Sequence, residues 1–296
     1  MPGGGVWYVA PGQVTEDSEL AMMLMNGLVD GGRKLDPDRL CYHYGVWYDY
    51  GPFAQKRINQ VKLKTHDWWE NKTPANRLAQ CDWKRNTSQV EGFSQCDWNK
   101  PNAGDAYEAS EKGMNYTSLS NGALARCMPF AIWGHKLALS VMYDAVTKDV
   151  NFTHCSVLIE HMTVSYIAAL KHLLNNPTAT DRRQKAFNAA RGYVEVFAYD
   201  PDTKKEMREI FDEVLNIKVE KGQRITREDY DPSKQEGLAK HAFILAMHFL
   251  TRDDIEDDKL YNEVMWQVAS LGGDTDTNCC IVGSAIGAYL GLAKLP

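Results

Sequence analysis

The chain has 296 residues, of which 44% are hydrophobic and 24% are charged, the composition of an ordinary globular protein. Its length suits one large domain or two small ones, and either could bury a sizeable hydrophobic core. The net charge of −6, from 33 Lys and Arg against 39 Asp and Glu, excludes a strongly basic protein, so we expect no nucleic-acid partner.

Neither the apolar segments nor the cysteines indicate export or a membrane. No apolar run reaches the roughly 18–20 residues that span a bilayer, so no membrane partner is expected. The opening Met-Pro-Gly-Gly-Gly has neither the positive start nor the apolar stretch of a targeting peptide. The seven cysteines are an odd number without CxxC spacing, which favours reduced thiols and a cytoplasmic, intracellular location.

Helical periodicity dominates the chain. Apolar residues recur at offsets 0, 3, 4, 7 and 8, or nearly so, which places them on one face of a helix. Asn-Pro, Asp-Pro and Gly-Gly pairs lie between these stripes, and no series of alternating strands is visible. We therefore predict an all-α, single compact multi-helix domain over residues 1–296. In chain order the stripes are Leu20, Met23, Leu24, Gly27 and Leu28; Ala186, Ala190, Tyr193, Val194 and Phe197; Ala242, Leu245, Ala246, Phe249 and Leu250; and Tyr261, Val264, Met265, Val268 and Ala269.

Residues 64–120 depart from this pattern, because they are polar, rich in tryptophan and only weakly periodic. A long irregular segment inside a domain is often functional. We expect this one either to form one rim of a substrate cleft or to be a packed surface insertion. Its tryptophans Trp68, Trp69, Trp83 and Trp98 should be partly buried.

Two carboxylates near the C-terminus are candidates for metal ligands. Asp274 and Asp276 follow Gly272-Gly273 and precede a helix-forming run. In a loop that enters a helix the two carboxylates can converge, and the glycines permit backbone angles that other residues resist. Together with the Thr277 hydroxyl they offer the oxygen ligands that Mg²⁺ and Mn²⁺ prefer. The alternative is an ordinary helix N-cap, at which Asp and Thr are common.

The run that follows this loop carries small residues four apart: Cys279, Gly283, Gly287 and Gly291. Such a strip lets a neighbouring helix approach closely. We therefore expect a buried central helix with the carboxylates at its start.

A second acidic segment, Thr15-Glu16-Asp17-Ser18-Glu19, begins the first helical stripe. Acidic residues in a first turn favour the helix dipole, so ordinary helix-start chemistry explains them equally well. The two segments together offer enough carboxylates and hydroxyls to hold two cations.

The two acidic segments, with two motifs between them, resemble the ADP-ribosylglycohydrolases. Residues 118–126, Ser-Leu-Ser-Asn-Gly-Ala-Leu-Ala-Arg, are similar to the family's glycine-asparagine-glycine loop that ends in arginine, here Arg126. Thr153-His154 is similar to a threonine-histidine motif at a helix start. The four motifs stand in the family's order, from about residue 12 to residue 296.

The resemblance implies an all-helical, metal-dependent hydrolase with its metal cluster in a central cleft. It implies two divalent cations, Mg²⁺ or Mn²⁺, and hydrolysis of the bond between ADP-ribose and a protein side chain or small acceptor. ADP-ribose or an ADP-ribosylated protein is then the expected partner. The implied metal ligands are Thr15, Glu16, Asp17, Asp274, Asp276 and Thr277; the implied substrate contacts are Ser118, Asn121, Gly122 and His154; Asp17 and Asp276 are the carboxylates placed to act in catalysis.

Two departures from the family pattern bear on activity. The first metal motif usually reads threonine-aspartate-aspartate-threonine, whereas Glu16 here adds one methylene. The family's usual N-terminal helix, which bears glycine-aspartate and the glutamate generally taken as the base, is not found upstream of Thr15. Gly104-Asp105-Ala106-Tyr107-Glu108 resembles part of it only superficially. The alternatives are therefore an ADP-ribose-binding pseudoenzyme or a structural protein.

Overall fold

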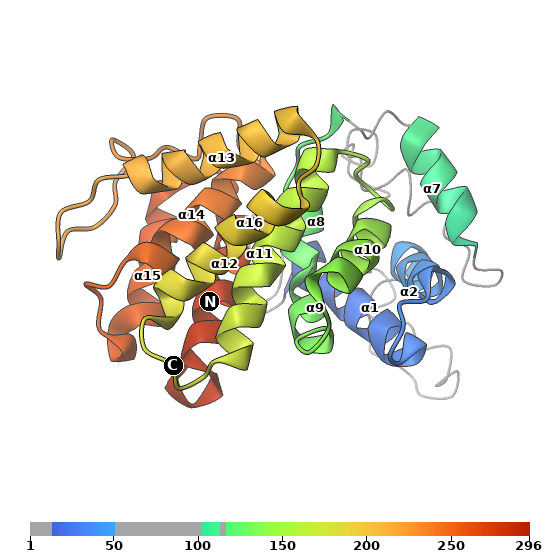
Figure 1. The fold of residues 1–296 in the computed structure, drawn as a ribbon, viewed down its shortest axis with the longest axis horizontal. Helices are drawn as coiled ribbons and strands as arrows, with labels where there is room; N and C mark the ends of the chain where they lie inside the picture. Colours follow the sequence, from blue (N-terminus) through green and yellow to red (C-terminus); the bar gives the residue numbers. More distant parts are fainter. Residues whose placement is uncertain (1–13, 51–101, 113–116) are drawn as a thin grey trace, which may run out of the picture. The chain divides into compact units, whose positions relative to one another are not determined.

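The structure is a computed structural model that describes residues 14–50, 102–112 and 117–296. Within these residues it is helical, and the only extended pairing is an isolated bridge between Ser120 and Leu238. The prediction of an all-α fold is confirmed (Figure 1). None of the described helices is both long and apolar enough to cross a lipid bilayer.

The described helices fall into two compact units, Met1–Ser118 with Lys148–Cys155, and Leu119–Thr147 with Ser156–Pro296. The first unit holds α1 (Glu16–Gly31), α2 (Pro37–Tyr50) and α7 (Ala103–Lys112). Helix α10 (Leu139–Val150) crosses the sequence boundary between the units. The second unit holds α8 (Gly122–Arg126), α9 (Met128–Trp133), α11 (Val157–Asn175), α12 (Arg182–Phe197), α13 (Pro201–Asn216), α14 (Ala239–Thr251), α15 (Asp257–Leu271), α16 (Thr275–Leu290) and the 3₁₀ turn η3 (Leu292–Lys294).

In the first unit α1 packs against α2 through the predicted stripe, whose five residues are all buried. Polar side chains are satisfied inside this contact, as buried polar groups must be. Trp47 Nε1 donates to Glu19 Oε2 at 3.0 Å, and the Tyr44 hydroxyl donates to Asp149 Oδ1. The acidic first turn of α1 is thereby attached to a packed helix pair.

Helix α7 contradicts part of the prediction for residues 64–120. Ala103–Lys112 is regular, and Ala103, Ala106 and Ser110 are buried on one face. These side chains are small, so the face carries little hydrophobic signal even though its spacing is helical. The four tryptophans lie outside the described residues.

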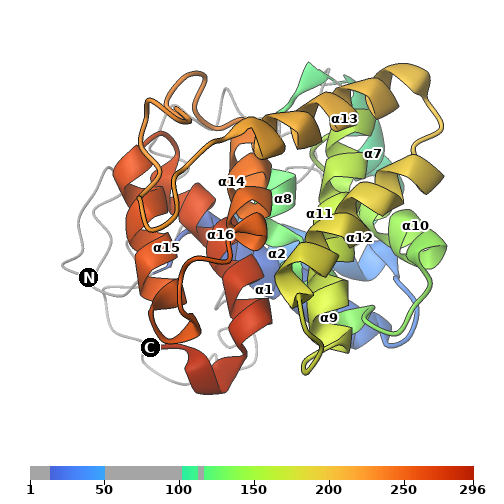
Figure 2. The same ribbon diagram turned by 60° about the vertical axis from the view of Figure 1, so that its left-hand side comes forward.

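In the second unit the long helix α11 is largely buried and packs against α12, α9 and α16 (Figure 2). Helix α16 packs against α14 and α15 as well. The predicted stripe of α14 is fully buried, and in α12 only Phe197 is half-exposed. Hydrophobicity at helical spacing thus predicts correctly which faces form this core.

The stripe predicted for α15 is partly wrong. Val264 and Val268 are buried as predicted, but Ala269 is exposed, and the buried face also carries Leu260, Gln267 and Leu271. Gln267 can lie inside because its Oε1 accepts a hydrogen bond from the Ile225 amide at 3.1 Å. A buried polar residue with a distant partner is invisible to hydrophobic periodicity.

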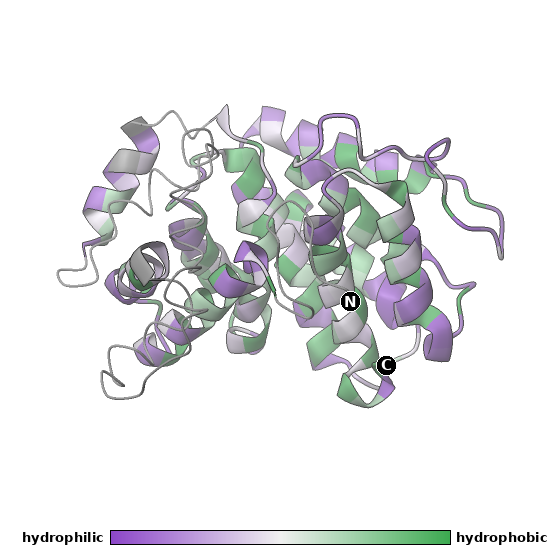
Figure 3. Cartoon of the chain, turned by 180° about the vertical axis from the view of Figure 1, so that it is seen from behind, coloured by the Kyte–Doolittle hydropathy of each residue, from purple (hydrophilic) through white to green (hydrophobic). Residues whose placement is uncertain are grey.

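The segment between α13 and α14, residues 217–238, is largely hydrophilic (Figure 3). An ion pair at the end of α14 ties its first part down. Arg252 Nη2 lies 2.6 Å from Asp254 Oδ2 and donates also to the Gln223 carbonyl at 2.9 Å, while the Gly222 amide donates to Asp254 Oδ2 at 2.8 Å. These contacts offset most of the desolvation cost of burying the charges of Arg252 and Asp254.

One turn before Arg252 lies His248, which is 3% exposed. Burial, together with the positive charge of Arg252, lowers its pKa from 6.5 to about 4. In the unfolded chain this histidine takes up a proton near its ordinary pKa. The folded chain does not do so until the pH approaches 4, so falling pH favours unfolding in that window.

We therefore predict that the free energy of unfolding decreases by about 1.4 kcal/mol per pH unit from this group between pH 6.5 and 4. In His248→Gln this component should be lost and the slope should flatten. Urea denaturation at a series of pH values measures it. The same exchange at the half-buried His135 is the matched control, and equal slopes in the two variants would contradict the assignment.

Candidate functional site

The turn between α15 and α16 has the backbone that the sequence predicts for it. Gly272 and Gly273 have φ angles of +75° and +73°, in the region that favours glycine. A Cβ on Gly273 would lie 2.6 Å from the Pro232 carbonyl oxygen, so the second glycine is needed for close approach as well. The segment before α14 therefore lies directly against this turn.

Asp274 follows this turn and occupies the N-cap position of α16, yet its side chain makes no capping hydrogen bond. Its Oδ2 instead accepts a hydrogen bond from Asn121 Nδ2 at 2.7 Å. The backbone carbonyl of Asp274 does accept the first helical bond, from the Asn278 amide at 2.9 Å. The position is thus that of a cap, while the carboxylate is directed to other partners.

The electrostatics at Asp274 are those of a crowded carboxylate pair. Burial raises its pKa above the ordinary value, and the neighbouring charge of Asp276 acts in the same direction. Hydrogen bonds from Asn121 and Thr277 oppose this rise. Two carboxylates and a hydroxyl of one helix start are therefore brought within interaction range, as the sequence predicts.

Backbone hydrogen bonds position Asn121. Its amide donates to the Gly237 carbonyl at 2.9 Å, and the Ala239 amide donates to the Leu119 carbonyl at 2.9 Å. This short two-stranded contact holds the loop before α8 against the start of α14. Gly122 begins α8 and is buried. Asn121, which we expected to contact substrate, thus contacts a predicted metal ligand directly.

Arg126 ends α8 and is completely buried. Its Nη1 lies 3.4 Å from the Gly122 carbonyl oxygen, which it can reach as a donor. The side chain thus braces the loop that carries Asn121.

Three further residues shape this turn, and no sequence motif identifies them. Arg227 Nε donates to the Leu271 carbonyl at 2.6 Å, so the arginine caps the end of α15. Pro232 lies against Gly273, and Gly237 has a φ of +83° beside the Asp274 carboxylate. The Asp-Pro pair at 231–232 marked a break between helices, but nothing in the sequence linked it to residues forty positions away.

In the first unit Thr15 is the N-cap of α1, with extended backbone and no side-chain capping bond. Its carbonyl accepts a hydrogen bond from the Glu19 amide at 3.1 Å. Asp17 is buried and Glu16 is half-buried in the first turn. Both acidic motifs therefore begin helices, and in neither does the first residue use its side chain as a cap.

The other predicted substrate residues of this unit are Ser118, which is half-buried, and His154, which is fully buried. His154 Nδ1 lies 2.8 Å from the Thr153 hydroxyl, and its amide donates to the Val150 carbonyl at 2.8 Å. The pair lies in the turn after α10, since α11 begins only at Val157, so the expected place at a helix start is wrong.

The six predicted metal ligands are divided between the two units. Within the part of the chain that the structure describes, no group of three or more His, Cys, Asp and Glu side chains is arranged to hold a metal ion. The two-cation cluster and its central cleft therefore stay predictions.

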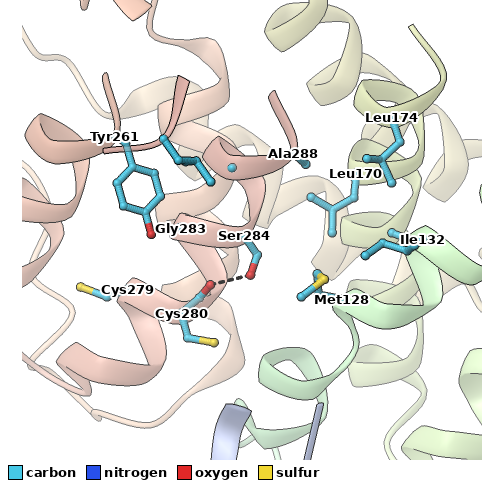
Figure 4. A pocket seen from close by; sticks show the side chains of 13 residues that line it. Met128, Ile132, Leu170, Leu174, Tyr261, Cys279, Cys280, Gly283, Ser284 and Ala288 are labelled. Atoms are coloured by element: carbon cyan, nitrogen blue, oxygen red, sulfur yellow. Dashed lines mark hydrogen bonds between the residues drawn. The ribbon is translucent and has the colours of Figure 1, made fainter. Parts of the chain in front are cut away.

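An apolar hollow of 490 Å³ lies along α16, and Figure 4 shows side chains of α9 and α11 on one side of it and α16 on the other. Its lining includes Ile132, Leu170 and two glycines of the predicted strip, Gly283 and Gly287. The close approach expected for that strip occurs at Gly283, where a Cβ would lie 3.2 Å from Met265 Sδ of α15, but Gly287 faces open space. Of these two glycines, only Gly283 is in close contact with a neighbouring helix among the described residues.

Cys279 also lines this hollow. Burial raises the pKa of its thiol to about 11, and the charge of Asp276 contributes. Because the thiolate is the nucleophile and the metal ligand, this cysteine is suited to neither role near neutral pH.

Comparisons with known proteins agree on one family. The sequence model of the family described as ADP-ribosylglycohydrolase matches residues 1–296. A protein of Acanthamoeba polyphaga mimivirus, assigned by name to the ADP-ribosyl glycohydrolases, is 22% identical over 301 residues, which cover 97% of this chain and 73% of the relative. A solved chain described as an ADP-ribosylglycohydrolase-related protein complex has a similar fold, with a TM-score of 0.62 and 18% identity over 100% of this chain and 78% of the solved one.

The contact at Gly273 yields a prediction. Gly273→Ala should lower the free energy of unfolding by more than the roughly 1–2 kcal/mol that a left-handed backbone costs an alanine, because the new methyl group meets the Pro232 carbonyl. Gly222→Ala is the matched control, since Gly222 has a φ of +79° and no atom within 4 Å of the added Cβ. Urea denaturation should separate the two variants; equal losses would show that the close approach is unimportant.

Proposed function

Because the chain belongs to the ADP-ribosylglycohydrolase family, we propose that it hydrolyses the glycosidic bond between ADP-ribose and an acceptor, either a protein side chain or a small molecule, with two bound Mg²⁺ or Mn²⁺ ions. The observation that carries the proposal is the Asn121 Nδ2 to Asp274 Oδ2 hydrogen bond of 2.7 Å, which orients a half-buried carboxylate next to Asp276 and Thr277.

The donor set fits hard divalent cations. Asp274, Asp276 and Thr277 supply only oxygen atoms, and positive charge would offset the repulsion between the two carboxylates. Thr15, Glu16 and Asp17 at the start of α1 would complete the ligands. When bound, such cations lower the pKa of a water molecule and orient the ribose hydroxyls.

The side chains of this chain then have separable tasks. Asn121 fixes the rotamer of Asp274, because a donated hydrogen bond holds one carboxylate oxygen and leaves the other to a ligand. The family resemblance assigns the diphosphate to backbone amides around Ser118 and Gly122 and assigns phosphate or ribose to His154, although the His154 side chain is fully buried and its Nδ1 lies 2.8 Å from the Thr153 hydroxyl.

Bond cleavage requires one proton to be removed and one to be returned. Water attacks the anomeric carbon C1″ as the bond to the acceptor breaks and oxocarbenium character develops. A carboxylate, either Asp17 or Asp276, accepts the proton of this water, and the departing acceptor atom takes up a proton. The products are free ADP-ribose and the unmodified acceptor.

The test is release of ADP-ribose from peptides ADP-ribosylated on arginine or on serine, with the full chain and Mg²⁺ or Mn²⁺, followed by chromatography. We expect release from one of the substrates. Asn121→Ala should reduce the rate about 10–100-fold, since residues that orient a metal ligand typically contribute that much. Asn188→Ala, at an exposed position of α12, is the matched control.

Two results would overturn the proposal. One is the absence of ADP-ribose release from every substrate while calorimetry shows that the cations bind. The other is an Asn121→Ala rate equal to that of Asn188→Ala, which would remove the contact from the active site.

A further inference from the structure

At its C-terminal end, α16 carries a tyrosine with two arginines over its ring. Cζ of Arg182 lies 5.0 Å and Cζ of Arg183 5.1 Å from the centroid of Tyr289. Guanidinium groups over a ring face are attracted by its quadrupole, so the ring holds both. Helix α12 begins and α16 ends on the same side of the second unit (Figure 2).

Positive charge exceeds negative charge at this place. Lys294 Nζ lies 2.7 Å from Asp257 Oδ2, and the Tyr289 hydroxyl donates to Asp257 Oδ1 at 3.0 Å, so this carboxylate is already engaged. Neither Arg182 nor Arg183 forms an ion pair with any carboxylate of the described residues. Among the described residues, Asp257 is therefore the one carboxylate within ion-pair distance of any of these three cations, in a chain whose net charge is −6.

The arginines also have unused donors. Arg182 Nη2 donates to the Leu173 carbonyl at 3.1 Å, but its Nε and the Nη1 of Arg183 are buried without a hydrogen-bond partner among the described residues. Nε2 of His172 is likewise buried without a hydrogen-bond partner among the described residues. Burial lowers the pKa of this histidine, and the positive charges of Lys185 and Arg182 act in the same direction. A buried N–H group without an acceptor costs about 1–3 kcal/mol, so an acceptor with negative charge would stabilise this cluster.

We propose that Arg182, Arg183 and Lys294 bind a phosphoryl group. The planar guanidinium matches phosphate oxygens with paired N–H groups, and a lysine adds a point charge. Tyr289 lies fifteen residues after Asp274 in one helix, a separation of about 22 Å. The site is therefore separate from the candidate catalytic carboxylates. Its ligand is either a free metabolite with a phosphate or diphosphate group or a phosphorylated side chain of a protein.

Calorimetry with inorganic pyrophosphate and with a phosphoserine peptide, without divalent cations, tests this proposal on the full chain. Binding at the candidate catalytic loop is common to all variants, so the difference between the Arg183 and Arg191 variants reports this site alone. Arg183→Gln should weaken binding of the preferred ligand about tenfold or more, as expected for loss of a charged hydrogen bond. Arg191→Gln removes the same charge from an exposed position of α12 and should leave the affinity unchanged.

Arg183 makes no hydrogen bond within the described residues, so its replacement should leave the fold intact, which circular dichroism checks. Arg182→Gln is the second variant and should weaken binding similarly. The better ligand of the two identifies the source of the phosphoryl group. Binding of neither ligand, or equal affinities of Arg183→Gln and Arg191→Gln, would overturn the proposal. ADP-ribose release by Arg183→Gln should equal that of the wild type, so the two proposals can fail independently.

Discussion

The hydrogen bond between Asn121 and Asp274 is the contact on which the candidate site of the second unit depends. It joins two segments that are 153 residues apart in the sequence. Asn121 can reach the carboxylate because its own backbone is paired with Gly237, and Asp274 is accessible because two glycines turn the chain sharply before α16. A change in any of these elements would displace an oxygen that has to be placed to a fraction of an ångström if it is to bind a cation.

Much of this arrangement could be predicted from local sequence. Stripes of apolar residues identified the buried faces of α1 and α14, since these faces are built from large side chains at helical spacing. The glycines before Asp274 could be predicted for the same kind of reason, because the backbone angle that they adopt is a property of single residues. Where buried faces are made of small or polar side chains, as in α7 and at Gln267, the pattern was too weak.

Contacts between distant segments could not be predicted. The sequence placed Asn121 opposite substrate, and only the fold shows that its amide reaches Asp274. The role of Arg227 could not be predicted either, because nothing in its hydrophilic segment indicates that it caps a helix end 44 residues later. Such partners depend on which segments the fold brings together, whereas periodicity reports only the environment of one element. For the same reason the ligands at the start of α1 stay predictions.

Helix α16 carries acidic residues at its start, and cations from α12 and η3 lie near its end, which is the arrangement that a helix dipole favours at both ends. The dipole does not by itself explain the cluster at Tyr289. It stabilises a cation at a helix end by about 0.3–1 kcal/mol, and only within the last turn. That is no more than the cost of one buried N–H group without an acceptor, and there are two on the arginines alone. The mutual repulsion of three cations adds to this cost. An anion would satisfy the donors and balance the charge together, which is why the cluster is better explained as a binding site than as an accessory to the helix.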